Sequence, residues 1–214
     1  MLEANGIKVN GEPKDIDDIK PRNEFTTIYQ TLNTNTSIPL SEIIKIINKK
    51  SHNLYAEQVL KTIGKELGGS GTVSKAIEIE KRFLSNIGID PEKIMIVDGS
   101  GLSRLNLVTP LQVTTLLTYM YRHKYWKEFY NSLPIAGVDG SLENRMRNSK
   151  AANNVRAKTG YVNYVRSLSG YVTSKDGEMF VFSMIVNHYT VPTSLANNIQ
   201  DLVCNRLANF SRKQ

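Results

Sequence analysis

Two short polar motifs, far apart in the sequence, could do chemistry together. One is Ser-His-Asn at 51–53, directly before a stretch with helical periodicity, and the other is Lys-Thr-Gly at 158–160, at the head of a predicted strand. A lysine ammonium can bind a carboxylate, and a serine hydroxyl can pass on a proton. Taken alone, each motif also has a simpler interpretation, because Ser and Asn are preferred helix N-caps and a three-residue match recurs by chance.

Other kinds of catalytic site find little support in the sequence. The histidines His52, His123 and His188 lie in different segments, without a second ligand at helical spacing, so we expect no metal site. The Gly-Lys pair at 64–65 has neither the preceding glycine nor the following Ser or Thr of a phosphate loop. Asp-Gly-Ser-Gly at 98–101 has the wrong spacing for a nucleophile elbow. No cofactor is expected.

The chain of 214 residues carries an excess of positive charge, with 27 Lys+Arg against 20 Asp+Glu and a net charge of +7. A basic surface suits nucleic acid or an anionic cell wall. The basic residues are dispersed and form no recognition motif, so a nucleic-acid-binding module is the less favoured alternative. The single cysteine, Cys204, lies in an apolar helical stretch, where we expect a buried and unreactive thiol. No run approaches the ~20 apolar residues of a transmembrane segment, and residues 1–11 contain no signal peptide.

Apolar residues at helical spacing predict helices that begin at Pro39, after Asn53, at Thr72 and at Thr109. Thr109 is followed by proline and then, three residues after the cap, by glutamine, which is a capping-box pattern. The side chains expected to face the core are Leu40, Ile43, Ile44 and Ile47 in the first helix, and Ala56, Val59, Leu60, Ile63 and Leu67 in the second.

The character of the sequence changes after residue 152. Strands are predicted at 154–163, 167–173 and 178–187, the last of them apolar enough to be buried on both faces. An Asp-Gly turn at 174–177 joins the second strand to the third. A closing helix over 194–210 is expected to bury one apolar face, made of Leu195, Ile199, Leu202, Val203 and Leu207.

Two further strands are predicted before this region, at 24–32 and at the start of 94–106. The whole pattern predicts an α+β protein in which 1–214 form a single lobe. In this lobe, 1–35 are a lead-in, 36–152 a helical region, and 153–214 the antiparallel strands with the closing helix.

Beyond the two polar motifs, longer segments follow one another in a known order. The segments 49–64, 97–110, 133–145 and 156–172 together resemble the C-terminal half of the class C low-molecular-mass penicillin-binding proteins. The resemblance implies part of a penicillin-binding/β-lactamase-like transpeptidase fold, with an antiparallel sheet flanked by helices. It also implies a serine-type D-alanyl-D-alanine carboxypeptidase or endopeptidase outside the cytoplasm, in the periplasm or cell envelope. Its substrate would be a peptidoglycan stem peptide ending in D-Ala-D-Ala, and β-lactams would acylate it.

The same resemblance assigns three catalytic residues. Ser51 would pass a proton to the leaving amine, and Asn53 would orient the substrate amide. Lys158 would supply positive charge to the terminal carboxylate of the substrate and lower the pKa of its neighbours. His52 stands where Asp or Glu is more usual, at a position that is expected to point away.

Three more residues are assigned to substrate binding. Thr159 would donate a hydrogen bond to the terminal carboxylate. Gly160 would let the substrate backbone approach the strand, because a side chain there would block it. The N–H of Tyr161 would form half of an oxyanion hole.

Two acidic segments between the motifs have both a structural and a functional interpretation. Asp98, Ser100 and Arg104 could line the cleft, but a glycine-rich turn with an aspartate also braces neighbouring loops. Asp139 could likewise belong to the site, or it could cap a helix that runs through Arg145. We favour the structural role for both segments.

The nucleophile of the resembled proteins, the serine of a Ser-x-x-Lys motif, is absent from this sequence. The nearest match, at 62–65, has threonine in place of serine. We therefore expect the N-terminal strands and the nucleophile helix to lie outside this chain, as an inactive piece of a longer enzyme. The alternatives are a catalytically dead peptidoglycan-binding pseudoenzyme and an interaction module. A sheet without those strands would expose an apolar edge near 180–186, which favours self-association.

Overall fold

The computed structural model describes residues 4, 6–8, 10–12 and 34–213. It forms two units, Met1–Ser37 and Ile38–Gln214, and the second unit contains all the helices and strands discussed below. The strand predicted at 24–32 lies outside the described residues. The division into a lead-in, a helical region and a strand region of one lobe stays a prediction.

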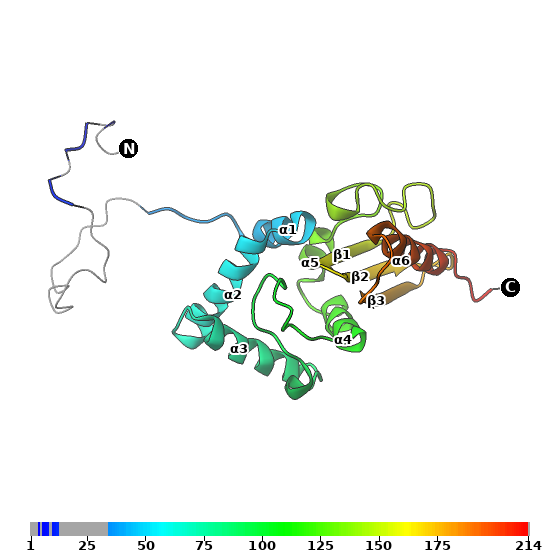
Figure 1. The fold of residues 1–214 in the computed structure, drawn as a ribbon, viewed down its shortest axis with the longest axis horizontal. Helices are drawn as coiled ribbons and strands as arrows, with labels where there is room; N and C mark the ends of the chain where they lie inside the picture. Colours follow the sequence, from blue (N-terminus) through cyan, green and yellow to red (C-terminus); the bar gives the residue numbers. More distant parts are fainter. Residues whose placement is uncertain (1–3, 5, 9, 13–33, 214) are drawn as a thin grey trace. The chain divides into compact units, whose positions relative to one another are not determined.

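The second unit begins with helices and ends with strands, as Figure 1 shows. Its elements are α1 (Leu40–Lys50), α2 (Asn53–Gly68), α3 (Val73–Asn86), the 3-10 helix η4 (Pro91–Lys93), α4 (Pro110–Tyr121), α5 (Trp126–Ser132), the 3-10 helix η5 (Gly140–Leu142), β1 (Arg156–Val162), β2 (Val165–Thr173), β3 (Met179–Asn187) and α6 (Thr193–Ala208).

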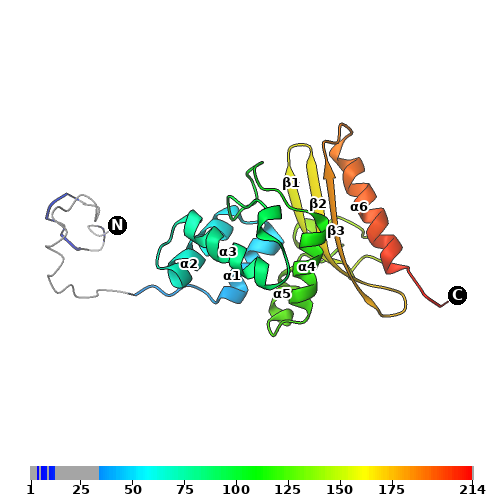
Figure 2. The same ribbon diagram turned by 90° about the horizontal axis from the view of Figure 1, so that it is seen from below.

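The sheet lies between two layers of helices, with α6 on one face and α4 and α5 on the other (Figure 2). The core on the α6 side contains Leu168, Phe182 and Cys204, and Cys204 is fully buried as predicted. The core on the other side is built around Tyr171, whose hydroxyl donates a 2.7 Å hydrogen bond to the carbonyl of Leu117. This arrangement confirms the α+β prediction.

The three strands form an antiparallel meander in the order β1-β2-β3. The predicted Asp-Gly turn joins β2 to β3, with Gly177 in the left-handed region at φ +83°. In the register of the first pair, Lys158 lies opposite Ser169 and Gly160 lies opposite Ser167. Because alternate residues of a strand point to the same face, Lys158 and Gly160 share one side of β1.

Two of the predicted helix starts are confirmed in atomic detail. The Thr72 hydroxyl accepts a hydrogen bond from the backbone N–H of Lys75 at the start of α3. At the start of α4, Thr109 and Gln112 form a complete capping box, followed by Pro110 at the first helical position. These caps satisfy N–H groups that would otherwise lack partners, so the sequence specifies the start of each helix.

The predicted buried face of α6 is wrong for four of its five residues, and only Leu207 packs against the core, partly buried. Leu195, Ile199 and Leu202 are 47%, 55% and 67% exposed, and Val203 is also exposed. The buried face consists of Ala196, Gln200, Cys204 and Ala208. The sheet face beneath α6 presents bulky side chains such as Leu168 and Phe182, and the short side chains of Ala196, Cys204 and Ala208 allow the helix to approach it closely.

Three smaller expectations also fail. The strand predicted near residue 94 is reduced to a single antiparallel bridge between Met95 and Leu107. Leu40 in α1 and Leu67 in α2 are 61% and 70% exposed instead of facing the core. In β3 only Phe182 is fully buried, because β2 is the one strand that pairs with β3 among the described residues.

Candidate active site

The two polar motifs of the sequence meet in the structure. The Lys158 ammonium donates hydrogen bonds to the Ser51 hydroxyl, at 2.9 Å, and to the carbonyl of Thr159, at 2.7 Å. Ser51 lies between two helices of the helical region, and Lys158 lies in β1, so the contact spans the boundary between helices and sheet. Serine and lysine are thus placed where a proton can pass between them.

Ser51 occupies the turn between α1 and α2 in an unusual conformation. It follows the last residue of α1 with φ 51° and ψ 50°, in the left-handed region that residues other than glycine seldom adopt. The cap of α2 comes from His52, whose Nδ1 accepts a hydrogen bond from the backbone N–H of Tyr55 at 3.3 Å. The alternative in which Ser51 or Asn53 caps this helix is therefore wrong. His52 does not simply point away, because it provides the cap.

Asn53 is the first residue of α2, and its side chain is exposed near the turn that carries Ser51. Because His52 caps the helix, neither Ser51 nor Asn53 is needed for that purpose. The Asn53 side chain is therefore available to a ligand, and the Ser51 hydroxyl, which accepts a hydrogen bond from Lys158, keeps its own proton to donate.

Lys158 is half-buried, and this burial lowers the pKa of its ammonium group below the ordinary value for lysine. Desolvation disfavours the charged form of a lysine, so Lys158 gives up a proton more easily than a surface lysine does. A lysine in this state can share a proton with the Ser51 hydroxyl, and in its protonated form it presents positive charge to an anion.

A third hydroxyl, missed in the sequence, joins the site. The Thr159 hydroxyl donates a 2.8 Å hydrogen bond to the hydroxyl of Ser141, which lies in η5. In the sequence, the only signal for Ser141 is its place in the segment 138–142, where Asp139 is the residue with an evident structural or functional role.

Gly160 is required by the neighbouring strand. A Cβ at Gly160 would lie 2.2 Å from the hydroxyl oxygen of Ser167, far closer than any real contact. Tyr161 is 55% exposed, and the guanidinium of Arg166 lies 3.7 Å from the centroid of its ring. The substrate-binding roles expected for Gly160 and Tyr161 stay predictions.

The segment at 98–101 serves as a brace. The Asp98 carboxylate accepts hydrogen bonds from the backbone N–H groups of Gly101 and Ser103, each at 2.7 Å. The Glu57 carboxylate in α2 accepts the N–H of Ser100 at 2.9 Å, which ties the loop to the helix. Burial alone would raise the pKa of Glu57, but hydrogen bonds from Ser100 and Gly99 outweigh it and lower the pKa. Arg104 is exposed at the rim of this loop.

Asp139 has a structural role, but it does not cap a helix. Its carboxylate forms an ion pair with the Lys49 ammonium at 2.5 Å and accepts the backbone N–H of Ile135 at 2.9 Å. Lys49 also donates to the carbonyl of Leu133 at 3.0 Å. This pair links the end of α1 to the segment that contains Ser141, and so it fixes two edges of the site relative to each other.

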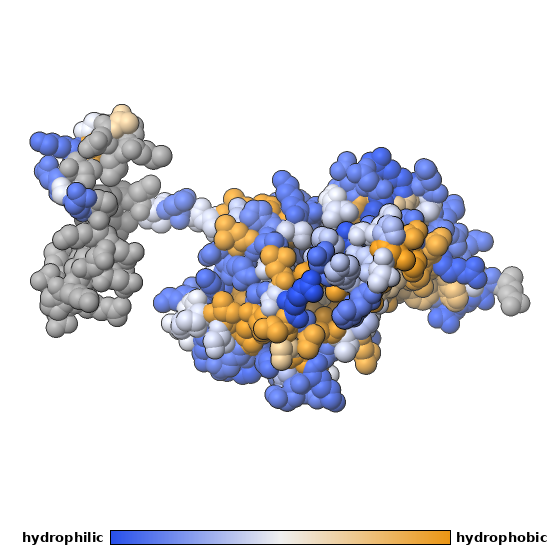
Figure 3. Space-filling view, in the orientation of Figure 1, coloured by the Kyte–Doolittle hydropathy of each residue, from blue (hydrophilic) through white to orange (hydrophobic). Residues whose placement is uncertain are grey.

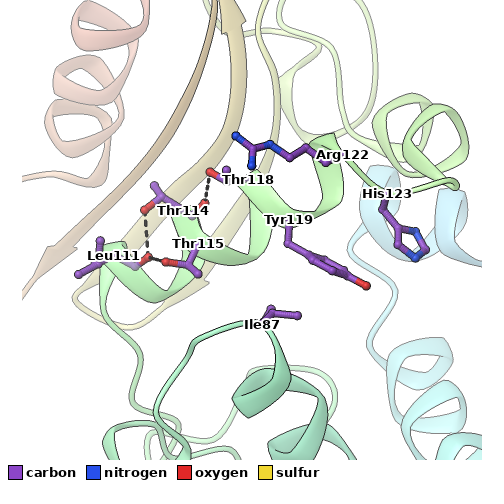
Figure 4. A pocket seen from close by; sticks show the side chains of 8 residues that line it. All are labelled: Ile87, Leu111, Thr114, Thr115, Thr118, Tyr119, Arg122 and His123. Atoms are coloured by element: carbon purple, nitrogen blue, oxygen red, sulfur yellow. Dashed lines mark hydrogen bonds between the residues drawn. The ribbon is translucent and has the colours of Figure 1, made fainter.

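Figure 4 shows a pocket that contains none of the predicted site residues. It lies mainly along α4, whose threonine hydroxyls turn back to their own helix. Thr114 and Thr115 donate to the carbonyl of Leu111, and Thr118 donates to the carbonyl of Thr114. These hydroxyls are thus used within α4, and the polar groups left to the pocket come from Tyr119, Arg122 and His123.

The sequence profile of the D-Ala-D-Ala carboxypeptidase 3 (S13) family matches residues 1–210 of the chain. The chain belongs to this S13 family. Membership confirms the resemblance that the four segments and the two polar motifs indicated.

A curated relative of this S13 chain is the D-alanyl-D-alanine carboxypeptidase of Actinomadura sp. (strain R39). It is 38% identical over 224 residues, which cover 100% of this chain and 39% of the relative. The chain therefore spans about two fifths of the length of that relative.

Solved structures show the same fold. Penicillin-binding protein 4 (dacB) of Haemophilus influenzae, in complex with a β-lactam, superposes with a TM-score of 0.84 and 26% identity. The match covers 98% of this S13 chain and 49% of that protein. The TLA-1 extended-spectrum β-lactamase, with a TM-score of 0.62 and 17% identity over 88% of this chain and 68% of its own, shares the fold alone. Both likenesses confirm the predicted penicillin-binding/β-lactamase-like fold.

Among the residues that the structure describes, no helix has the length and apolarity needed to cross a membrane. Within the same residues, no group of three His, Cys, Asp or Glu side chains lies close enough together to hold a metal ion.

Proposed function

We propose that this chain carries the substrate-binding half of the active site of a serine-type D-alanyl-D-alanine carboxypeptidase or endopeptidase. The substrate would be a peptidoglycan stem peptide ending in D-Ala-D-Ala. The observation that carries the proposal is the 2.9 Å contact between Lys158 and Ser51, two residues from motifs far apart in the sequence. Membership of the S13 family supports the same reaction class.

In the proposed reaction, a serine outside this chain attacks the carbonyl of the D-Ala–D-Ala bond. Ser51 passes a proton to the departing D-Ala amine, and the half-buried Lys158 helps to carry that proton. Asn53, at the exposed start of α2, orients the substrate amide. Water then hydrolyses the ester of the acyl-enzyme and releases the shortened peptide.

The terminal carboxylate of the substrate would lie against the start of β1. Lys158 supplies the positive charge, and the hydroxyl of Thr159 donates a hydrogen bond. Gly160 leaves room for the substrate backbone beside β1, and the N–H of Tyr161 forms half of the oxyanion hole.

The chain by itself is expected to be inactive, because its sequence contains no Ser-x-x-Lys motif. The second candidate function, a peptidoglycan-binding pseudoenzyme, is favoured by the fact that the groups proposed to hold the carboxylate are all present without a nucleophile. A chain of either kind would act outside the cytoplasm, in the periplasm or cell envelope, where peptidoglycan lies. We also propose that the chain self-associates through β3, the edge strand of its sheet.

A labelled penicillin tests the proposed reaction. We expect covalent labelling of a longer S13 protein that contains this chain and a Ser-x-x-Lys serine, and no labelling of the 214-residue chain alone. In the longer protein, Ser51→Ala should slow labelling by roughly 100-fold, as expected for loss of a proton-transfer group. Labelling of the chain alone would show that it contains another nucleophile, and the proposed division of the site would be wrong.

A further inference from the structure

The segment Asp139–Leu142 connects the two halves of the candidate site, although the proposed reaction gives it no role. Its first residue, Asp139, forms the ion pair with Lys49 at the end of α1. Its last residue, Leu142, is fully buried in the core beneath the sheet. Gly140 has φ +59°, and a Cβ there would lie 2.8 Å from the carbonyl oxygen of Lys49. The backbone between these anchors is therefore held tightly against α1.

This anchoring leaves Ser141 with its side chain exposed beside β1. Its hydroxyl oxygen accepts the proton of the Thr159 hydroxyl at 2.8 Å. A serine hydroxyl has one proton to donate and two lone pairs that accept. In the part of the chain that the structure describes, the Ser141 proton goes to no protein acceptor. That proton is available to a ligand at the surface.

The groups around Ser141 favour an anionic ligand. Lys158 supplies a positive charge, and it donates to the carbonyl of Thr159, the residue whose hydroxyl contacts Ser141. Two acidic residues lie two positions from Ser141. Asp139 is already occupied by the Lys49 ammonium and the N–H of Ile135, and Glu143 lies beyond the buried Leu142 with its side chain exposed. Hydroxyl donors next to a cation, with the neighbouring carboxylate neutralised, match the chemistry of a carboxylate, which accepts several charge-assisted hydrogen bonds.

We propose that Ser141 is a further binding residue, which donates its hydroxyl to the C-terminal carboxylate of the peptide beside Thr159 and Lys158. The ion pair between Lys49 and Asp139 holds Ser141 in place. When the ligand binds, Thr159 turns its proton from Ser141 to one carboxylate oxygen, and Ser141 donates to the other. This inference rests on the proposed function and extends its binding site from β1 to η5.

The test compares two probes, acetyl-D-Ala-D-Ala with a free carboxylate and the same dipeptide with a C-terminal amide. Their dissociation constants are measured by NMR titration of the 214-residue chain. Wild-type protein should bind the carboxylate probe at least about tenfold more tightly than the amide, because charge-assisted hydrogen bonds are lost with the amide. Ser141→Ala should weaken the carboxylate probe by roughly tenfold and leave the amide unchanged. Ser141→Thr, which keeps the hydroxyl, should restore most of the affinity.

Ser85→Ala, a substitution of an exposed serine in α3, is the matched control and should bind both probes as the wild type does. Equal affinity of Ser141→Ala and wild type for the carboxylate probe would overturn the role of Ser141 and leave the proposed function standing. A wild-type protein that does not distinguish the carboxylate from the amide would overturn both.

Discussion

Lys158 is half-buried, and the loss of hydration disfavours its charge although the ammonium donates two hydrogen bonds. Burial lowers the pKa of its ammonium, so in the folded state the charged form is disfavoured relative to the unfolded chain. This placement lowers the free energy of unfolding. In return, the lysine can hold an anion and exchange a proton with Ser51. Such local costs are common where a side chain serves a ligand instead of the fold.

The first prediction concerns Lys158→Met, which keeps the length of the side chain and removes the charge. We expect this variant to lose carboxylate binding and to gain about 1 kcal/mol of stability at neutral pH, or roughly 2–4 °C in Tm. The gain should shrink with rising pH. Between the lowered folded pKa of Lys158 and its ordinary value the unfolded chain binds more protons, so the wild type becomes more stable there. Thermal unfolding from pH 7 to pH 10.5 measures both effects, and a variant less stable at every pH would refute the explanation.

At the scale of elements, the ion pair between Lys49 and Asp139 joins α1 to η5. The Lys49 side chain is only 15% exposed and the Asp139 side chain 37% exposed, so the pair lies at a partly dry contact. The carbonyl of Leu133 and the N–H of Ile135 complete the hydrogen bonding of the two groups. The pair therefore fixes the distance between the turn that carries Ser51 and the segment that carries Ser141.

The second prediction concerns Asp139→Asn, which leaves the Lys49 ammonium without its counter-charge. We expect a loss of about 1–3 kcal/mol in the free energy of unfolding, the usual cost of removing a hydrogen bond to a charged group. Glu143→Gln, at an exposed position next to η5, removes the same charge from the surface and is the control. Urea unfolding of both variants measures the difference. Equal stability of the two variants would mean that the ion pair between Lys49 and Asp139 contributes nothing to the stability of the fold.

Some of these elements could be predicted from the sequence because the signal is local. The caps Thr72 and Thr109 and the turn at Gly177 depend on residues within a few positions, and all three were predicted correctly. The meeting of Ser51 with Lys158 was predicted only through the resemblance, because nothing local brings two distant motifs together.

The wrong predictions have a common physical reason. The surface against which a residue packs determines whether it is buried and what it binds, and the local sequence does not show that surface. In α6 the long apolar side chains formed the stronger pattern, but the helix face against the sheet is mostly made of short side chains, such as Ala196 and Cys204. The sequence did not indicate Ser141, because Asp139 nearby is a typical helix-capping residue and accounts for the segment. In the structure, Asp139 instead pairs with Lys49 of α1.

At the scale of the whole chain, two surfaces are open to a second copy, which are the apolar residues that α6 leaves exposed and the edge of the sheet at β3. Apolar side chains lie over α6 on the face in view in Figure 3. The exposed apolar residues of this helix are Leu195, Ile199, Leu202 and Val203. A strand edge pairs with any other strand, and two copies of β3 related by a two-fold axis would pair antiparallel.

The third prediction follows from this surface. The wild-type chain should associate with itself as its concentration rises, and Leu202→Glu should weaken that association by about tenfold or more, since it places a charge in an apolar contact. Gln58→Glu adds the same charge at an exposed position of α2, away from α6, and should have little effect. Sedimentation velocity over a range of concentrations measures the outcome. A wild-type chain that stays monomeric at high concentration would exclude this contact.

The position of Cys204 gives the protein a built-in reporter. It is the only cysteine in the sequence, it is fully buried on the face of α6 that packs on the sheet, and burial raises its pKa to about 12. The thiolate is the form that attacks thiol reagents, and it is scarce and shielded as long as α6 stays on the sheet. The rate at which such a reagent modifies Cys204 therefore reports how often α6 detaches from the sheet. A partner that covers the helix would lower this rate without contacting the sulfur.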